Sequence, residues 1–296
     1  MHSVLLRLGE FQLHSYGVCL ALGILFAYGV LVRLGRSRGF SSDRLANLLA
    51  LLVVCGLAGA RTFFVVEHWA DYRADPASAL RIWEGGLMFY GSIVFGAAAL
   101  VAHCRITRSP MLPLLDLFAV AVPVGQAFGR VGCLLNGCCY GRPSDSCLAV
   151  TYPRWSIPCV EQIRAGLLPE DAARSLPVLP SQLFEAAGCL LLFLALLWLY
   201  RRLNPPAPHA AGTEAAPEAR PVAAVLQTAG AGLVLAGWLA GYGVLRFLVE
   251  TTRADERAHP FGGPLTISQT IGAGCILLAA ALAAFVLLRN RKPATA

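Results

Sequence analysis

Charged residues are scarce in this sequence, and lysine is nearly absent. Asp, Glu, Lys and Arg make up 14% of the 296 residues, and Lys292 is the single lysine. Soluble domains carry roughly 25% charged residues, which help to cover their surface. A water-soluble globular fold is therefore excluded. The 57% of hydrophobic residues instead predicts an all-α polytopic integral membrane protein.

Three other features are missing. No internal repeat is apparent, whereas repeated halves are typical of transporters. The ten cysteines do not form two C-x-x-C pairs, and no histidine lies between Cys133 and Cys159, so we expect no metal ion and no cofactor. The first apolar run has no basic segment before it and no small-residue cleavage site close behind it, so we expect this helix to be retained.

About seven transmembrane helices are predicted, because seven apolar segments are long enough to cross a hydrocarbon core of about 30 Å. The segments are 16–34, 45–66, 87–104, 111–128, 181–200, 222–249 and 267–288. Arginines are dense beside the ends of the first, third, fifth and seventh segments. Because basic residues favour the cytoplasmic side, this distribution predicts an outer N-terminus and a cytoplasmic C-terminus.

The connections between the segments suggest the domain organisation. We assign 1–203 to a membrane domain of five spans and 222–296 to the last two spans of the same domain. Residues 204–221 are rich in proline and alanine, which predicts a flexible cytoplasmic linker. Residues 142–180 are expected to form a small extracytoplasmic cap. Within it, Cys147–Tyr152 suggests a short strand and Pro158–Arg174 a short amphipathic helix.

The stretch from Pro123 to Pro143 is the most unusual part of the chain. It reads P-V-G-Q-A-F-G-R-V-G-C-L-L-N-G-C-C-Y-G-R-P and follows directly on an apolar run. Glycines let the backbone approach a ligand closely, and arginine binds anions such as phosphate with two parallel hydrogen bonds. The stretch therefore indicates an anion site at the membrane surface. The alternative is that Arg130 only extends its side chain toward the interface.

The sixth apolar segment ends in a second set of charged residues. Arg246, Glu250 and Arg253 are spaced i, i+4 and i+7, which places them on one helix face. Ionisable residues at the end of an apolar run indicate a functional site, with Glu250 orienting the arginines. A salt bridge within a hydrated helix end is the simpler alternative.

Other polar residues lie at predicted helix ends. Gln182 and Glu185 follow Pro180, where they suit the first turn of a helix by bonding free N–H groups and complementing the helix dipole. Tyr16 and Tyr90 lie at the starts of the first and third segments, where aromatic residues are usually interfacial anchors.

Together these segments resemble one enzyme family. The stretch G-R-V-G-C-L-L-N-G-C-C-Y-G-R is similar to the signature of the bacterial prolipoprotein diacylglyceryl transferases (Lgt), whose pattern is close to G-R-x-G-N-F-x-N-x-E-x-x-G. Four further segments occur in the family's order: H-S-Y-G, W-E-G-G-L-M-F-Y-G, P-S-Q-L-F-E and R-F-L-V-E-T-T-R. Five ordered motifs that extend over most of the chain are a specific signal.

The resemblance implies an activity, its substrates and its location. Members transfer the diacylglyceryl group of phosphatidylglycerol to the lipobox cysteine thiol of a preprolipoprotein and release glycerol phosphate. The implied partners are thus phosphatidylglycerol, lipobox-bearing signal peptides and membrane lipid, with no nucleic acid. The implied location is the bacterial cytoplasmic (inner) membrane, with the active site on its outer side.

The resemblance also implies roles for individual residues. The implied catalytic residues are Arg246, Glu250, Tyr90 and Tyr16, and the implied phosphatidylglycerol-binding residues are Arg130, Gly129, Gly132, Asn136, Gly141, Arg253 and Gln182. Three positions depart from the family pattern. Cys133 and Cys138 replace Asn and Glu, and Tyr90 replaces a histidine that is often proposed to handle the thiol proton. Tyrosine, with a pKa near 10, is a poor base at neutral pH, so water, a carboxylate or an arginine-lowered thiol pKa takes over that task, or the activity has changed.

The clustered cysteines leave several alternatives open. We favour packing for Cys133 and Cys138, which predicts that Cys138→Ser keeps a working enzyme; a folded but inactive variant would favour thiol chemistry. A disulfide between Cys147 and Cys159 is a second hypothesis, because oxidation is permitted outside the cytoplasm. A thiol oxidoreductase that uses Cys138 and Cys139, or a small-molecule transporter, are the alternative functions.

Overall fold

The computed structural model describes residues 4–8, 11–205, 230–253 and 265–291. The chain divides into two compact units, which are described separately. Unit 1 comprises residues 1–30, 115–209 and 228–296, and unit 2 comprises residues 31–114 and 210–227. Most of the predicted linker, from 206 to 221, lies outside the described residues.

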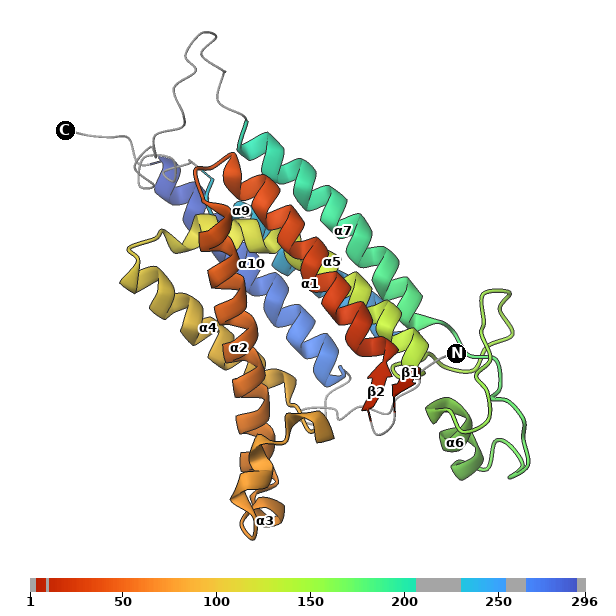
Figure 1. Cartoon of the computed structure of the whole chain (residues 1–296). Helices are drawn as coiled ribbons and strands as arrows, with labels where there is room; N and C mark the ends of the chain where they lie inside the picture. The colour runs from red at the N-terminus through yellow and green to blue at the C-terminus, as the bar shows by residue number, and fades with distance from the viewer. Residues whose placement is uncertain (1–3, 9–10, 206–229, 254–264, 292–296) are drawn as a thin grey trace, which may run out of the picture. The chain divides into compact units, whose positions relative to one another are not determined.

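Seven helices in the described part of the chain are long and apolar enough to cross a membrane, which confirms the predicted fold class (Figure 1). They are α1 (Ser15–Arg36), α2 (Ser42–Glu67), α4 (Phe89–Ile106), α5 (Met111–Asn136), α7 (Ser181–Leu203), α9 (Leu233–Glu250) and α10 (Ile267–Arg291). The protein is thus a multi-pass membrane protein. The orientation of its termini stays a prediction.

Two helices differ in extent from the predicted segments. Helix α5 continues past the predicted end at Phe128 to Asn136, so Arg130 and Gly132 lie within this helix. A helix in an apolar environment keeps its backbone hydrogen bonds even where glycines are frequent. Helix α9 begins at Leu233, because residues 230–232 form a turn and the buried carboxylate of Asp116 accepts hydrogen bonds from the N–H groups of Gly232 (2.7 Å) and Leu235 (2.8 Å). Residues 222–229 of the predicted segment lie outside the described residues.

The α9 and α10 helices form the most extensive helix–helix contact of unit 1, and α9 also packs on α7. The first pair crosses where Gly243 and Gly272 bring the two backbones together. Before α1, the strands β1 (Val4–Leu8) and β2 (Phe11–His14) pair antiparallel, with Leu8 opposite Phe11. This hairpin was not predicted from the sequence.

The cap of unit 1 contains the short helix α6 (Ile157–Arg164) (Figure 1). The predicted helix therefore ends ten residues before Arg174, because the chain turns at Gly166 (φ 70°). The predicted strand at 147–152 is reduced to an isolated bridge between Val150 and Val178. All ten cysteines lie in the described part of the chain and all are free thiols, so the Cys147–Cys159 disulfide is not formed.

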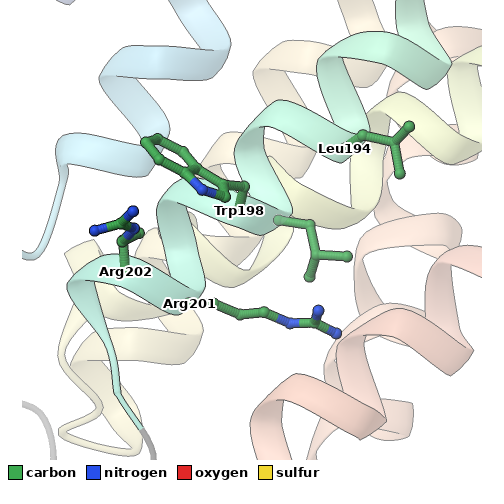
Figure 2. A pocket seen from close by; sticks show the side chains of 5 residues that line it. Leu194, Trp198, Arg201 and Arg202 are labelled. Carbon is green, nitrogen blue, oxygen red and sulfur yellow. The ribbon is translucent and has the colours of Figure 1, made fainter.

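The end of α7 carries a group of aromatic and basic side chains that is typical of a membrane interface. Leu194, Leu197, Trp198, Arg201 and Arg202 line a shallow surface depression (Figure 2). The Arg202 guanidinium lies 5.1 Å from the centroid of the Trp198 ring, within the range of a cation–π contact. Such residues anchor a helix end at the headgroup level.

Unit 2 is organised around a buried arginine. Helices α2 and α4 pack along each other, and α3 (Trp69–Tyr72) and the 3-10 turns η1 (Pro76–Leu80) and η2 (Ile82–Glu84) connect them. Arg61 of α2, which is 6% exposed, donates hydrogen bonds to the carbonyl oxygens of Ser78, Ala79, Arg81, Gly85 and Gly86 at 2.6–3.3 Å. One guanidinium thus holds the whole connection in place.

Replacing Arg61 should destabilise unit 2. We expect Arg61→Gln to lower the free energy of unfolding by about 3 kcal/mol, because several buried carbonyl oxygens lose a charged donor. Arg73→Gln, at an exposed arginine of the same connection, should change it by less than about 0.5 kcal/mol. Denaturant unfolding in detergent measures both variants; equal stabilities would contradict the assigned role of Arg61.

Candidate active site

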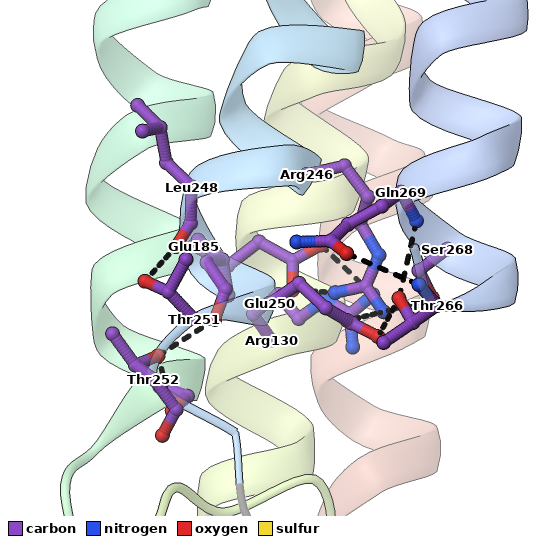
Figure 3. Close-up of polar contacts among 12 residues, drawn as sticks. Arg130, Glu185, Arg246, Leu248, Glu250, Thr251, Thr252, Thr266, Ser268 and Gln269 are labelled. Carbon is purple, nitrogen blue, oxygen red and sulfur yellow. Dashed lines mark hydrogen bonds and ion pairs between the residues drawn. The ribbon is translucent and has the colours of Figure 1, made fainter. Parts of the chain in front are cut away.

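Glu185 joins two arginines inside unit 1. Its side chain is 1% exposed, and it forms ion pairs with Arg130 of α5 (Nη2–Oε1, 2.9 Å) and Arg246 of α9 (Nη1–Oε2, 3.3 Å). The Tyr242 hydroxyl donates a third hydrogen bond to Oε1 at 3.2 Å. Figure 3 shows the two arginines converging on this carboxylate. Two of the predicted site residues, far apart in the sequence, are thus brought together.

Glu250 holds Arg246 from the other side. Nη2 of Arg246 lies 3.2 Å from Glu250 Oε2 and donates a hydrogen bond to the Ser268 hydroxyl at 3.1 Å. The Thr266 hydroxyl donates to Glu250 Oε1 at 2.8 Å (Figure 3). The spacing-based pairing of Arg246 with Glu250 is therefore present in the structure, and Ser268 at the start of α10 supports it.

The guanidinium groups of the cluster are more exposed than the carboxylates that bind them. The side chains of Arg130 and Arg246 are 22% and 13% exposed, whereas those of Glu185 and Glu250 are 1% and 4% exposed. The carboxylates thus lie behind the guanidinium groups and fix their orientation. Partly exposed guanidinium groups that are already oriented bind a phosphate with little loss of conformational freedom.

The end of α5 brings three cysteines together. Gly137 (φ 76°) ends the helix, with its N–H bonded to the carbonyl of Leu134 (3.2 Å) and the N–H of Cys138 bonded to the carbonyl of Cys133 (3.1 Å). This pair of bonds is the Schellman motif, which places the second residue after the helix end over its last turn. Cys139 also has a left-handed backbone (φ 61°), which directs the chain back toward the helix end. The sulfur atoms of Cys133, Cys138 and Cys139 lie within 4.8 Å of one another.

The surroundings of Cys139 lower the pKa of its thiol. Hydrogen bonds from the thiols of Cys133 and Cys138 lower the pKa of Cys139 below that of an ordinary thiol, and a hydrogen bond and the positive charge of Arg253 lower it further, against the opposing effect of burial. Arg253, a predicted phosphatidylglycerol-binding residue, also pairs through its backbone with Gly141, two residues after Cys139.

Gly141 ties three segments of unit 1 together. Its N–H donates to the Leu179 carbonyl at 2.8 Å, and it pairs with Arg253 in an antiparallel bridge just after α9. A Cβ atom at Gly141 would lie 2.6 Å from the carbonyl oxygens of Leu179 and Thr252, closer than contact distance allows. Only glycine fits at this junction.

Substituting this glycine should break the junction. We expect Gly141→Ala to lower the free energy of unfolding by about 2 kcal/mol or more, because backbone carbonyls cannot move aside as a flexible side chain does. Gly129→Ala is the matched control, since a Cβ atom there meets nothing within 4 Å. Thermal unfolding in detergent separates the two; a Gly141→Ala variant as stable as Gly129→Ala would contradict the prediction.

Three other predicted residues lie near this region of unit 1. Gln182 is 1% exposed and donates from Nε2 to the Cys138 carbonyl (2.8 Å) and the Tyr152 hydroxyl (3.0 Å), so it ties α7 to the cap. Asn136 is the last residue of α5. Tyr16 packs on Gly132, where a Cβ atom would lie 3.1 Å from Cδ2 of its ring. A direct role in substrate binding or catalysis stays a prediction for all three.

Tyr90 belongs to the other compact unit. It is the second residue of α4 and 52% exposed. Its catalytic role therefore stays a prediction.

Glu185 is the central residue that the sequence analysis did not assign to the site. Its position in the first turn of a helix suggested a capping role, but its carboxylate faces α5 and α9. An ionisable residue inside a membrane span is a functional candidate by default, and that signal would have found it.

Comparison with known proteins decides the family. A family model described as prolipoprotein diacylglyceryl transferase matches residues 3–285. The chain belongs to the prolipoprotein diacylglyceryl transferase family. The resemblance of the five motifs is thereby confirmed, and so is the assignment to the transferases.

Individual relatives agree with this assignment. Phosphatidylglycerol–prolipoprotein diacylglyceryl transferase 2 of Clostridium perfringens is 30% identical over 67% of this chain and 72% of its own length. The transferase of Parasynechococcus marenigrum is 34% identical over 67% of both chains. The transferase of Trichormus variabilis is 27% identical over 97% of this chain and 90% of its own.

Proposed function

We propose that this protein transfers the diacylglyceryl group of phosphatidylglycerol to the lipobox cysteine thiol of preprolipoproteins. The observation that carries the proposal is the pairing of Arg130 and Arg246 on the buried carboxylate of Glu185. Both guanidinium groups are held in place before a ligand arrives. A phosphodiester is the part of phosphatidylglycerol that such a pair recognises.

In this mechanism the arginines stabilise the leaving group. The thiol of the substrate cysteine loses its proton to water and its sulfur attacks the diacylglyceryl carbon. The carbon–oxygen bond to phosphate breaks, and the oxygen leaves with the electron pair as glycerol phosphate. Negative charge therefore grows on the phosphate during the reaction, and fixed guanidinium donors stabilise it most at that point. Glu185 and Glu250 keep the donors aligned and do not touch the reacting atoms.

The proposed setting is the outer side of the bacterial inner membrane. The arginine-rich end of α7, with Arg201 and Arg202, is the cytoplasmic end under the predicted orientation. Glu185 lies near the opposite end of the same helix, so the headgroup site would face outward, where a secreted lipoprotein precursor presents its cysteine.

A reconstituted assay tests the proposal. Purified protein in phosphatidylglycerol vesicles should convert a lipobox peptide to its diacylglyceryl thioether and release one glycerol phosphate for each thioether. A peptide with serine in place of the cysteine should stay unmodified, because a hydroxyl is a much weaker nucleophile. Thioether formed equally well from vesicles of phosphatidylethanolamine alone, or none formed from phosphatidylglycerol, would refute the proposed substrate.

A further inference from the structure

The three thiols at the end of α5 have the spacing of a metal site. The sulfur atoms of Cys133, Cys138 and Cys139 all lie within 4.8 Å of one another. Zinc–sulfur bonds of about 2.3 Å place the sulfurs of a tetrahedral site roughly 3.8 Å apart. The sulfur–sulfur distances would therefore have to shorten by at most about 1 Å for all three sulfurs to bind one zinc ion. Rotation of the cysteine side chains can provide this change.

The backbone fixes this arrangement. The Schellman motif bonds the N–H of Cys138 to the Cys133 carbonyl (3.1 Å), so these two residues are held together by the helix end itself. The side-chain amide of Gln182, on α7, donates a hydrogen bond of 2.8 Å to the Cys138 carbonyl oxygen. Main-chain contacts thus hold Cys133 and Cys138 in place without a metal, which is what a site with a defined geometry needs.

One coordination position would remain open. Among the described residues, the group contains three cysteines and no fourth His, Asp or Glu ligand. Three protein ligands and an exchangeable fourth position characterise catalytic zinc sites, whereas structural sites are closed by four. Cys133 is 8% exposed, but Cys138 and Cys139 are only half-buried, so a ligand from outside has access.

The open position would lie next to the arginines. Cys133 follows Arg130 by three residues on α5, so both side chains lie on the same helix face less than one turn apart. Arg253 pairs through its backbone with Gly141, two residues after Cys139, which places a positive charge near the three thiolates. A ligand on the metal would thus be close to a phosphate held by Arg130.

We propose that Cys133, Cys138 and Cys139 bind a zinc ion whose fourth position takes the substrate cysteine as a thiolate. This inference rests on the proposed function. Coordination releases the thiol proton to water, because a metal-bound thiol is deprotonated outright. The sulfur then forms its bond to the diacylglyceryl carbon as the carbon–oxygen bond breaks, and glycerol phosphate leaves with the electron pair. The thioether product is a weaker ligand and departs.

The proposal also gives the thiol proton a destination that does not involve Tyr90. A zinc-bound thiol needs no general base, whereas a tyrosine with a pKa near 10 is a poor base at neutral pH. The proposal reverses the packing interpretation of Cys133 and Cys138, and it predicts loss of transfer in Cys138→Ser.

Metal titration tests the site itself. Full-length protein in detergent, stripped with a chelator, should bind one Co²⁺ with sulfur-to-metal charge-transfer absorption, and Zn²⁺ should displace it. Cys133→Ser, Cys138→Ser and Cys139→Ser should each weaken zinc binding by at least about 100-fold, whereas Cys147→Ser, an exposed cysteine outside the cluster, should bind as the wild type does. Absence of the thiolate band, or equal binding by all four variants, overturns the proposal.

A second measurement separates this inference from the proposed function. Adding a lipobox peptide should change the Co²⁺ spectrum, and the serine peptide should not. Arg246→Lys should keep the spectrum and its response while losing transfer. If the metal binds and responds but no thioether forms in the wild type, the proposed function fails and the thiol-binding metal site stands. If transfer persists in chelator-treated protein free of metal, the metal proposal fails and the proposed function stands.

Discussion

Arg130→Lys and Arg246→Lys should each lower the rate of diacylglyceryl transfer by about 100-fold or more, with the protein still folded. Lysine keeps the positive charge, but it presents a single ammonium group instead of a planar fork. It therefore loses the parallel bonds to phosphate and the fixed alignment on Glu185, which lies 2.9 Å from Arg130 and 3.3 Å from Arg246. Transfer of labelled diacylglyceryl from phosphatidylglycerol to a lipobox peptide measures the loss.

Arg202→Lys is the matched control for both variants. Arg202 lies at the other end of α7 against Trp198, so its replacement should leave transfer within about twofold of the wild type. Near-full activity in both Arg130→Lys and Arg246→Lys would remove the arginine pair from the catalytic site.

Glu185→Gln should have the second large effect. The amide keeps the shape of the carboxylate and some of its hydrogen bonds, but two mostly buried guanidinium groups lose their shared countercharge. Breaking a buried ion pair by removing one partner typically costs about 3–5 kcal/mol. The partial exposure of Arg130 and Arg246, at 22% and 13%, should reduce this cost to about 2 kcal/mol.

The transfer rate of Glu185→Gln distinguishes a loss of stability from a loss of arginine alignment. We expect a fall of about 100-fold even at temperatures where the variant is folded, because the arginines are no longer held in one orientation. Glu161→Gln is the control, since Glu161 bonds Tyr140 in the cap and should leave the rate nearly unchanged. If the rate of Glu185→Gln falls only in proportion to its unfolded fraction, Glu185 is a structural residue alone.

The membrane spans could be predicted from the sequence because the hydrocarbon core sets a minimum length for an apolar segment. One predicted segment ended too early because polar and small residues continue the helix, as at Arg130 to Asn136 in α5. A boundary predicted from hydropathy lies where the apolar run ends. The helical backbone hydrogen bonds can continue for several residues beyond that point.

The residues of the site were predicted better than their contacts. The spacing of Arg246 and Glu250 on one helix face was enough to predict their pairing, which the structure contains at 3.2 Å. The ion pair between Arg130 and Glu185 joins two residues that are 55 positions apart in the sequence, on α5 and α7. No local sequence pattern predicts such a contact. Ser268 and Thr266 were missed for the same reason.

The cysteine cluster shows a local signal that was overlooked. The order C-L-L-N-G-C-C places cysteines at the third residue before a helix end and the second after it, with glycine between them. Those are the positions that a Schellman motif brings into contact. The contribution of Cys139 depends on its left-handed backbone (φ 61°), which the sequence does not specify.

Restoration of lipoprotein modification in bacteria depleted of their own transferase tests the central claim most directly. We expect the wild-type chain to restore the diacylglyceryl modification of a reporter lipoprotein. Arg246→Lys, inserted in the membrane at the same level, should not restore it. A wild-type protein that inserts but leaves the reporter unmodified would refute the transferase activity, and an Arg246→Lys variant that restores the modification fully would refute the role of the arginine pair.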